Sequence, residues 1–149
     1  MICSLFALRN ALKINIKDIN KSYKILKQYQ INDWNRFTSI VHRENLIWDG
    51  DEFSMTVYTW DYGQFLSDFT GNRCFVKVLN GELTYSDTKL PDVIKNSYTK
   101  LSDYIENSDT KISDLTEKTV GCNDVIYTEL NHILHSKDRY SVSLHIYPK

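Results

Sequence analysis

Three polar side chains alternate along the last predicted strand of the chain. Ser143, His145 and Tyr147 are each separated by one residue, and side chains two apart in a strand lie on the same face. We expect all three to face the interior of a barrel. Because buried polar groups need partners, the spacing predicts an internal network of a hydroxyl, an imidazole and a phenol.

Histidine and cysteine are the other residues that could support metal chemistry. His132 and His135 are three positions apart, so in a strand their side chains point to opposite faces, which disfavours a shared metal ion. Cys3, Cys74 and Cys122 are odd in number and far apart. This argues against a disulfide framework or a cysteine-rich zinc site, and it favours a reducing, cytoplasmic setting.

The composition excludes several classes of partner. A length of 149 residues suits one domain with one core, and a formal net charge of -1 gives no basic surplus for binding nucleic acid. No run approaches the roughly 20 apolar residues that a membrane helix needs. The apolar opening has no basic residues before it, so we expect a core-facing helix there and not a signal peptide.

The elements that must position these residues begin with helices. Asn15 could cap a helix, with Asp18 three residues later in a capping-box-like position. Four apolar residues then share one predicted helical face: Ile16, Ile19, Tyr23 and Leu26. A short helix is expected after Asn32, carrying Trp34 and Phe37.

From Arg43 onward the apolar period changes to two. Alternation from Phe53 to Thr59 predicts a strand with one buried face. Asp49–Asp51 is a good turn, and Asn80-Gly81 is the strongest short hairpin signal in the chain. Strands are predicted at 53–59, 73–79, 82–85, 124–130 and 140–147.

One segment interrupts the strands. Pro91 suits a first helical position, and four apolar residues follow at helical spacing: Ile94, Tyr98, Leu101 and Ile105. We expect a helix over 91–105 that covers the barrel or forms a contact surface. Helices first and strands afterwards predict an α+β, mainly β protein, with N-terminal helices on a small antiparallel barrel.

Two segments carry more specific motifs. Cys74 precedes the hairpin glycine, Gly81, in Arg73–Leu83, and Ser143–Pro148 has the pattern Ser-x-His-x-Tyr. These segments resemble the first cupin motif and the C-terminal strand of the cysteine dioxygenase type I family, in which a cysteine replaces the usual cupin glutamate. Further matches are Asp33-Trp34, Arg43 and Asn45-Leu46, and the resemblance covers roughly residues 32–85 and 120–148.

The resemblance implies a fold and a chemistry. It implies one cupin (jelly-roll) domain over 1–149, with a helical cap at 1–40 and a barrel at 41–149. Members of that family oxidise a thiol to a sulfinate with O₂ at one Fe(II) ion. Three neutral histidines hold the iron, two from a His-x-His in the first motif and one from the second, and open coordination positions accept thiolate and dioxygen.

The sequence departs from the family at these ligand positions. Counting back from Cys74 places Ser67 and Phe69 at the His-x-His, and counting back from Ser143 places Asn131 at the third position. Serine is a poor iron ligand, phenylalanine is none, and asparagine is weak. A one-residue slip would bring His132 to the third position, but such a slip turns the side chain to the other face.

Other family positions are retained. The resemblance implies that Ser143, His145 and Tyr147 form a relay toward the substrate thiolate, and that Cys74 and Tyr147 are the pair that some members join by a thioether. A small apolar role for Cys74 in the barrel is favoured. Arg43 matches the arginine that clamps the substrate carboxylate, but Val41 replaces the family's flanking tyrosine, so a surface salt bridge is an equal alternative.

These observations support three hypotheses. The first is a pseudoenzyme with no iron or other cofactor, which binds a small amino acid or thiol in the barrel, or a protein partner. The alternative is an active thiol dioxygenase with a rebuilt Fe(II) site. The third is a structural or oligomerising barrel. The sequence names no oligomeric state.

Overall fold

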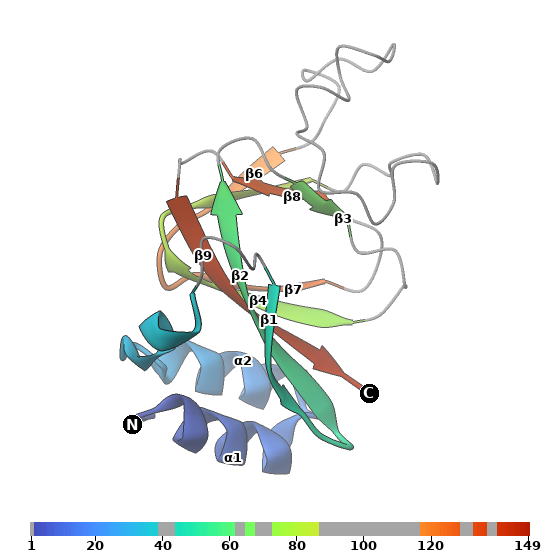
Figure 1. Cartoon of the computed structure of the whole chain (residues 1–149). Coiled ribbons are helices and arrows are strands. Elements are labelled where there is room, and N and C mark those ends of the chain that lie inside the picture. Colours follow the sequence, from blue (N-terminus) through green and yellow to red (C-terminus); the bar gives the residue numbers. More distant parts are fainter. Residues whose placement is uncertain are drawn as a thin grey trace.

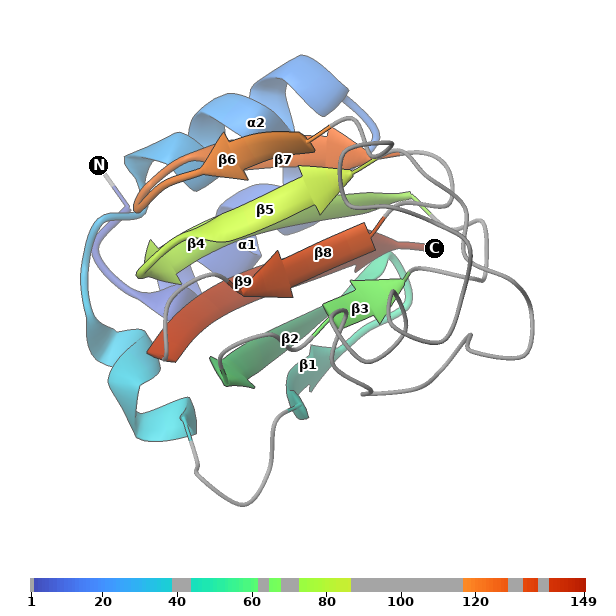
Figure 2. The same ribbon diagram turned by 90° about the horizontal axis from the view of Figure 1, so that it is seen from above.

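Two antiparallel sheets face each other, and two helices cover the outer side of the larger sheet (Figures 1 and 2). The computed structural model describes residues 2–38, 44–61, 65–67, 73–86, 117–128, 133–136 and 140–149. The helical elements are α1 (Leu5–Asn15), α2 (Ile19–Gln28) and the 3₁₀ helix η1 (Asp33–Phe37). No helix within these ranges is long and apolar enough to cross a membrane.

The strands follow the helices in the chain. They are β1 (Glu44–Asp49), β2 (Phe53–Asp61), β3 (Phe65–Ser67), β4 (Cys74–Asn80), β5 (Leu83–Ser86), β6 (Glu117–Val120), β7 (Val125–Thr128), β8 (Ile133–Ser136) and β9 (Tyr140–Pro148). The larger sheet has the order β1-β2-β9-β4-β7 and the smaller has the order β3-β8-β5-β6. The predicted mainly β, cupin-like fold class with N-terminal helices is confirmed. The described strands form two facing sheets and not a closed barrel.

The larger sheet is buried on both faces. Phe53, Met55 and Val57 of β2 pack in the cluster that contains the helices, while Tyr58 and Trp60 of the same strand pack in a second cluster between the sheets. The prediction of one buried face for this strand was therefore wrong. The alternation is present, but the helices cover the face that would otherwise meet water.

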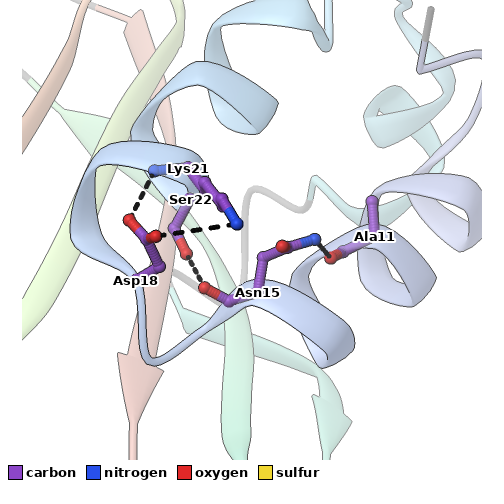
Figure 3. Close-up of polar contacts among 5 residues, drawn as sticks. All are labelled: Ala11, Asn15, Asp18, Lys21 and Ser22. Atoms are coloured by element: carbon purple, nitrogen blue, oxygen red, sulfur yellow. Dashed lines mark hydrogen bonds and ion pairs between the residues drawn. The ribbon is translucent and has the colours of Figure 1, made fainter.

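The start of α2 also differs from the prediction (Figure 3). Asn15 does not cap a helix but ends α1, where its side-chain amide donates to the carbonyl of Ala11 at 2.9 Å. Asp18 is the cap of α2, because its carboxylate accepts from the backbone N–H of Lys21 at 3.0 Å. The hydroxyl of Ser22 donates to the Asn15 carbonyl at 2.8 Å and joins the two helices.

This later start changes the buried face of α2. Ile16 and Leu26 are buried as predicted, but Ile19 and Tyr23 are each 38% exposed, so the predicted four-residue face was wrong. Because Ile16 lies in the turn before Asp18, it does not continue the helical stripe. The fully buried polar residue of α2 is Ser22, which the sequence pattern did not indicate.

Most predicted strands are present near their expected bounds. The predictions at 53–59, 73–79, 82–85 and 140–147 match β2, β4, β5 and β9, and β7 lies within 124–130. Strands β1, β3, β6 and β8 were not among the predicted ranges. Strands β3, β6 and β8 have three or four residues, which are too few to show a period of two. The predicted helix at 91–105 lies outside the described residues.

A buried lysine joins α2 to the larger sheet. Lys77 of β4 is fully buried, and its ammonium donates to the carbonyl of Leu26 in the last turn of α2 at 2.6 Å. The Nζ atom lies 6.0 Å from the centre of the Tyr29 ring. Burial, and then the nearby positive charge of Lys27, lower the pKa of Lys77 to about 8.

The turn predicted at Asn80-Gly81 is present and leads to a stability prediction. The predicted hairpin was wrong, because β4 and β5 belong to different sheets and do not pair with each other. Gly81 has a φ of 72°, and a Cβ there would lie 2.5 Å from Ser141 Oγ and 2.9 Å from the Tyr140 carbonyl oxygen. We expect Gly81→Ala to lower the free energy of unfolding by at least about 2 kcal/mol, from backbone strain and this contact. Urea denaturation measures the change.

Gly121→Ala is the matched control, because the nearest atom to an added Cβ is Asp124 Oδ2 at 3.6 Å, an ordinary contact. Its unfolding free energy should stay within about 0.5 kcal/mol of the parent. Equal effects of the two substitutions would contradict the geometry assigned to Gly81.

Candidate functional site

The inner face of the larger sheet collects the polar residues predicted from the sequence. Three neighbouring strands, β2, β9 and β4, supply side chains to this face. His145 of β9 lies opposite Thr56 of β2 on one side and Val76 of β4 on the other. Side chains on this face alternate with those under the helices, so every second residue of each strand points between the two sheets.

A chain of hydrogen bonds runs along β9. The indole Nε1 of Trp60 donates to the hydroxyl of Ser143 at 2.8 Å, and this hydroxyl lies 2.8 Å from Nε2 of His145. On the other side of the ring, His145 Nδ1 lies 3.2 Å from the hydroxyl of Tyr147. Ser143 is fully buried and His145 is 1% exposed. We call these four residues, Trp60, Ser143, His145 and Tyr147, the relay.

The donors of the relay point in one direction. An indole N–H can only donate, so the Ser143 oxygen accepts from Trp60. Within the part of the chain that the structure describes, His145 Nε2 is the only acceptor for the Ser143 proton. The ring proton of His145 therefore lies on Nδ1, directed toward Tyr147.

Two further side chains meet the relay at its Tyr147 end. The Sγ atom of Cys74 lies 3.8 Å from His145 Nδ1, and this buried thiol donates to the Phe75 carbonyl at 3.4 Å. The hydroxyl of Tyr58 lies 3.2 Å from that of Tyr147, and the Tyr58 ring centre is 4.2 Å from that of His145. A thiol, an imidazole and two phenols thus converge between the sheets.

The structure brings together four of the five predicted site residues. Cys74, Ser143, His145 and Tyr147 share one network. Their catalytic roles stay predictions. The fifth residue, Arg43, lies outside the described residues, as does Val41, and its role in carboxylate binding is untested.

The predicted ligand positions are described only in part. Ser67 is in β3 and its backbone lies opposite Ile133 of β8. His135 is in β8, opposite Phe65. Phe69, Asn131 and His132 lie outside the described residues, so the assignment of the ligand positions stays a prediction from the sequence.

Two residues of this site were not predicted. The strand pattern put Tyr58 on the exposed face and gave Trp60 no role, although the two share a face with Thr56 by the period of two. If both faces of β2 had been recognised as buried, Tyr58 and Trp60 would have been assigned to the space between the sheets. Their aromatic character was the available signal, because large aromatic residues are rarely left in water.

Among the residues that the structure describes, the donor atoms around the relay do not make up a three-histidine iron centre. Both ring nitrogens of His145 have hydrogen-bond partners, Ser143 on one side and Tyr147 on the other, so the imidazole has no lone pair directed at a metal. Within the described ranges, no three histidine, cysteine, aspartate or glutamate residues lie close enough together to hold a metal ion. The expected ligand positions carry serine, phenylalanine and asparagine.

Comparisons with known proteins agree with this architecture. The family model described as cysteine dioxygenase type I matches residues 2–149. A solved structure from Bacillus halodurans is similar with a TM-score of 0.54 at 13% identity, covering 81% of this chain and 80% of that chain. A Neisseria meningitidis protein has a TM-score of 0.50 at 9% identity, covering 83% and 96%. A cupin superfamily protein from Desulfitobacterium hafniense has a TM-score of 0.47 at 11% identity, covering 70% and 74%.

Proposed function

Since this chain belongs to the cysteine dioxygenase type I family, we propose that it is a member that works without iron and binds a small amino acid or thiol beside the relay. The observation that carries ligand binding is an intact hydrogen-bonded relay around the buried His145. The absence of iron is proposed separately, from Ser67, Phe69 and Asn131 at the positions where the family has histidines.

The chemistry of the Tyr147 end supports this class of ligand. Tyr58 and Tyr147 place two hydroxyl oxygens 3.2 Å apart beside the Cys74 thiol. Hydroxyl groups donate to thiolate and carboxylate, and a site out of water strengthens such bonds. A protein partner that inserts a side chain here is a second form of the same binding function.

The alternative is an active thiol dioxygenase with a rebuilt Fe(II) site. The retained relay is compatible with this alternative as well, because a tyrosine hydroxyl beside His145 could bind a thiolate substrate with or without iron. That function requires at least two further ligands from the chain. Both proposals place the protein in a reducing, cytoplasmic setting, consistent with three free cysteines.

Metal analysis separates the two proposals. After anaerobic loading with Fe(II) and desalting, we expect the protein to retain well under one iron per chain by elemental mass spectrometry, because imidazole ligands are lacking at the ligand positions. Iron near one per chain would overturn the iron-free proposal and establish the alternative.

The same preparation tests ligand binding by thermal shift with cysteine and with alanine, its thiol-free counterpart. Cysteine should raise the melting temperature more than alanine, and Tyr147→Phe should remove the difference. Tyr140→Phe is the matched control, because Tyr140 is an exposed phenol on the same strand. An unchanged melting temperature with both amino acids would contradict binding of this ligand class.

A further inference from the structure

A second hollow lies on the other side of the larger sheet, away from the relay. It has a volume of about 370 Å³ and is lined by residues of the α1–α2 turn, the β1–β2 hairpin and the end of β9. Figure 1 shows that these three elements lie at the same end of the molecule. Its floor includes Phe75 and Tyr127, whose ring centres are 4.6 Å apart. We call it the end pocket. Its size and aromatic floor are typical of sites for small ligands.

Four charged side chains of both signs surround the end pocket. Lys17 and Arg73 are cations, and Asp51 and Glu52 are anions. Within the part of the chain that the structure describes, none of these four side chains makes an ion pair or a hydrogen bond. The neighbouring cation of Lys149 does not neutralise the two acids, because it pairs with Asp49 at 2.5 Å.

The order of strands separates Arg73 from the two acids. Asp51 and Glu52 precede β2, whereas Arg73 precedes β4, and β9 lies between these strands. Adjacent strands are about 4.8 Å apart, so the backbones of β2 and β4 lie roughly 10 Å apart across β9. The acidic and basic ends of the end pocket are separated by the same distance. Phe53 of β2 lies opposite Pro148 of β9. When the β4–β9 register is continued by two residues from the Phe75–Ile146 pair, Arg73 also lies opposite Pro148.

We propose that the end pocket binds a short zwitterionic peptide, with its ammonium at Asp51 and Glu52 and its carboxylate at Arg73. Two extended residues span at most about 7 Å, and the lengths of the acidic and guanidinium side chains make up the remaining distance between the two ends. A planar guanidinium suits a carboxylate. The two acids would repel a polyanion, and Arg73 and Lys17 would repel a simple cation, so a ligand with both charges fits this lining best.

The side chain of such a peptide lies on the aromatic floor. Phe75 is fully buried, so the partly buried Tyr127 ring packed against it offers the contact surface for an apolar peptide side chain. We therefore expect a preference for peptides with an aromatic or aliphatic residue.

Isothermal titration calorimetry with the dipeptide Ala-Phe tests the proposal. N-acetyl-Ala-Phe lacks the ammonium and Ala-Phe-amide lacks the carboxylate. We expect Ala-Phe to bind, and each blocked form to bind at least tenfold more weakly. No heat of binding with Ala-Phe, or equal affinities for all three compounds, would overturn the proposal.

Two variants test which residue binds the carboxylate of the dipeptide and which binds its ammonium. Arg73→Gln should bind Ala-Phe and its amide equally, whereas Glu52→Gln should reduce the discrimination against the acetylated form. Lys21→Gln is the matched control, since Lys21 is an exposed lysine paired with Asp18 on α2 and is not in the end pocket. Tyr147→Phe should leave dipeptide binding unchanged, so this test is independent of the function proposed for the relay. Full discrimination retained in Arg73→Gln would refute the assigned orientation.

Discussion

The combined variant Ser67→His, Phe69→His and Asn131→His is expected to bind Fe(II), although the parent chain should not. Residues 67 and 69 are two apart, so in a strand their side chains share a face. In β3, Ser67 lies opposite Ile133, two positions after Asn131 in the sequence. Phenylalanine and histidine are similar in size, so Phe69→His changes the volume of the side chain little. Three imidazoles from two strands provide the ligand type that iron accepts.

Elemental mass spectrometry of the triple variant beside the parent measures the effect. We expect a gain from well under one iron per chain to a clearly higher stoichiometry, with little cysteine oxidation, because nothing has been built to orient the new rings. The double variant Ser67→His with Phe69→His should bind less iron. A folded triple variant with no gain would show that the ligand positions counted from Cys74 and Ser143 are misassigned.

His132→Ala resolves the third position if the parent itself binds iron. Loss of that iron in the His132→Ala background would show that His132, and not Asn131, marks this position. Iron that is retained in the His132→Ala variant would show that residues other than His132 hold it.

The second large effect concerns the buried ammonium of Lys77. Its pKa is about 8 in the folded protein against 10.5 for an ordinary lysine, chiefly because of burial. The unfolded chain therefore binds more protons than the folded protein between these two values. The contribution of Lys77 to the free energy of unfolding should be constant below about pH 8 and should rise with pH above it, by about 3 kcal/mol over the whole interval.

Urea denaturation between pH 7 and pH 9.5 measures this slope. The window ends there because burial, together with the bond to Asp33, raises the pKa of Tyr29, which makes stability fall once tyrosines of the unfolded chain ionise near pH 10. Lys77→Met should abolish the rise, since it replaces the ammonium with an apolar side chain of similar length. Lys21→Met is the control and should keep the rise, because the Lys21 side chain is exposed and its charge does not contribute to the lowered pKa of Lys77. A flat profile in the parent would contradict the folded-state pKa of Lys77.

Local signals predicted the central strands well. Gly81 at a positive φ and the alternation through β9 both depend on a few neighbouring residues, so the sequence contains the necessary information. The same alternation is sufficient to predict that Ser143, His145 and Tyr147 share one face of their strand. Strand propensity and turn chemistry act over two to nine residues, and this is the range over which the predictions succeeded.

Long-range packing explains the failures. Lys77 and Tyr58 lie on opposite faces of the larger sheet, and a strand pattern alone cannot show that helices cover one face and a second sheet covers the other. The capping error at Asn15 arose because Asn15 and Asp18 are both good caps, and α1 packing decides which one is used. The iron-ligand positions were predicted by counting residues back from Cys74 and Ser143, through segments that show no periodic pattern.

The position of β9 has a consequence for how the chain acquires its structure. β9 is the central strand of the larger sheet, between β2 and β4, and it is synthesised after every other described strand. Its pairing with β2 joins residues such as Phe53 and Pro148 that are far apart in the sequence. The sheet therefore cannot close on the ribosome until the last residues of β9 have emerged. Until then β2 and β4 expose unpaired edges, so the nascent chain should depend on chaperones, and refolding in solution should be slow for its size.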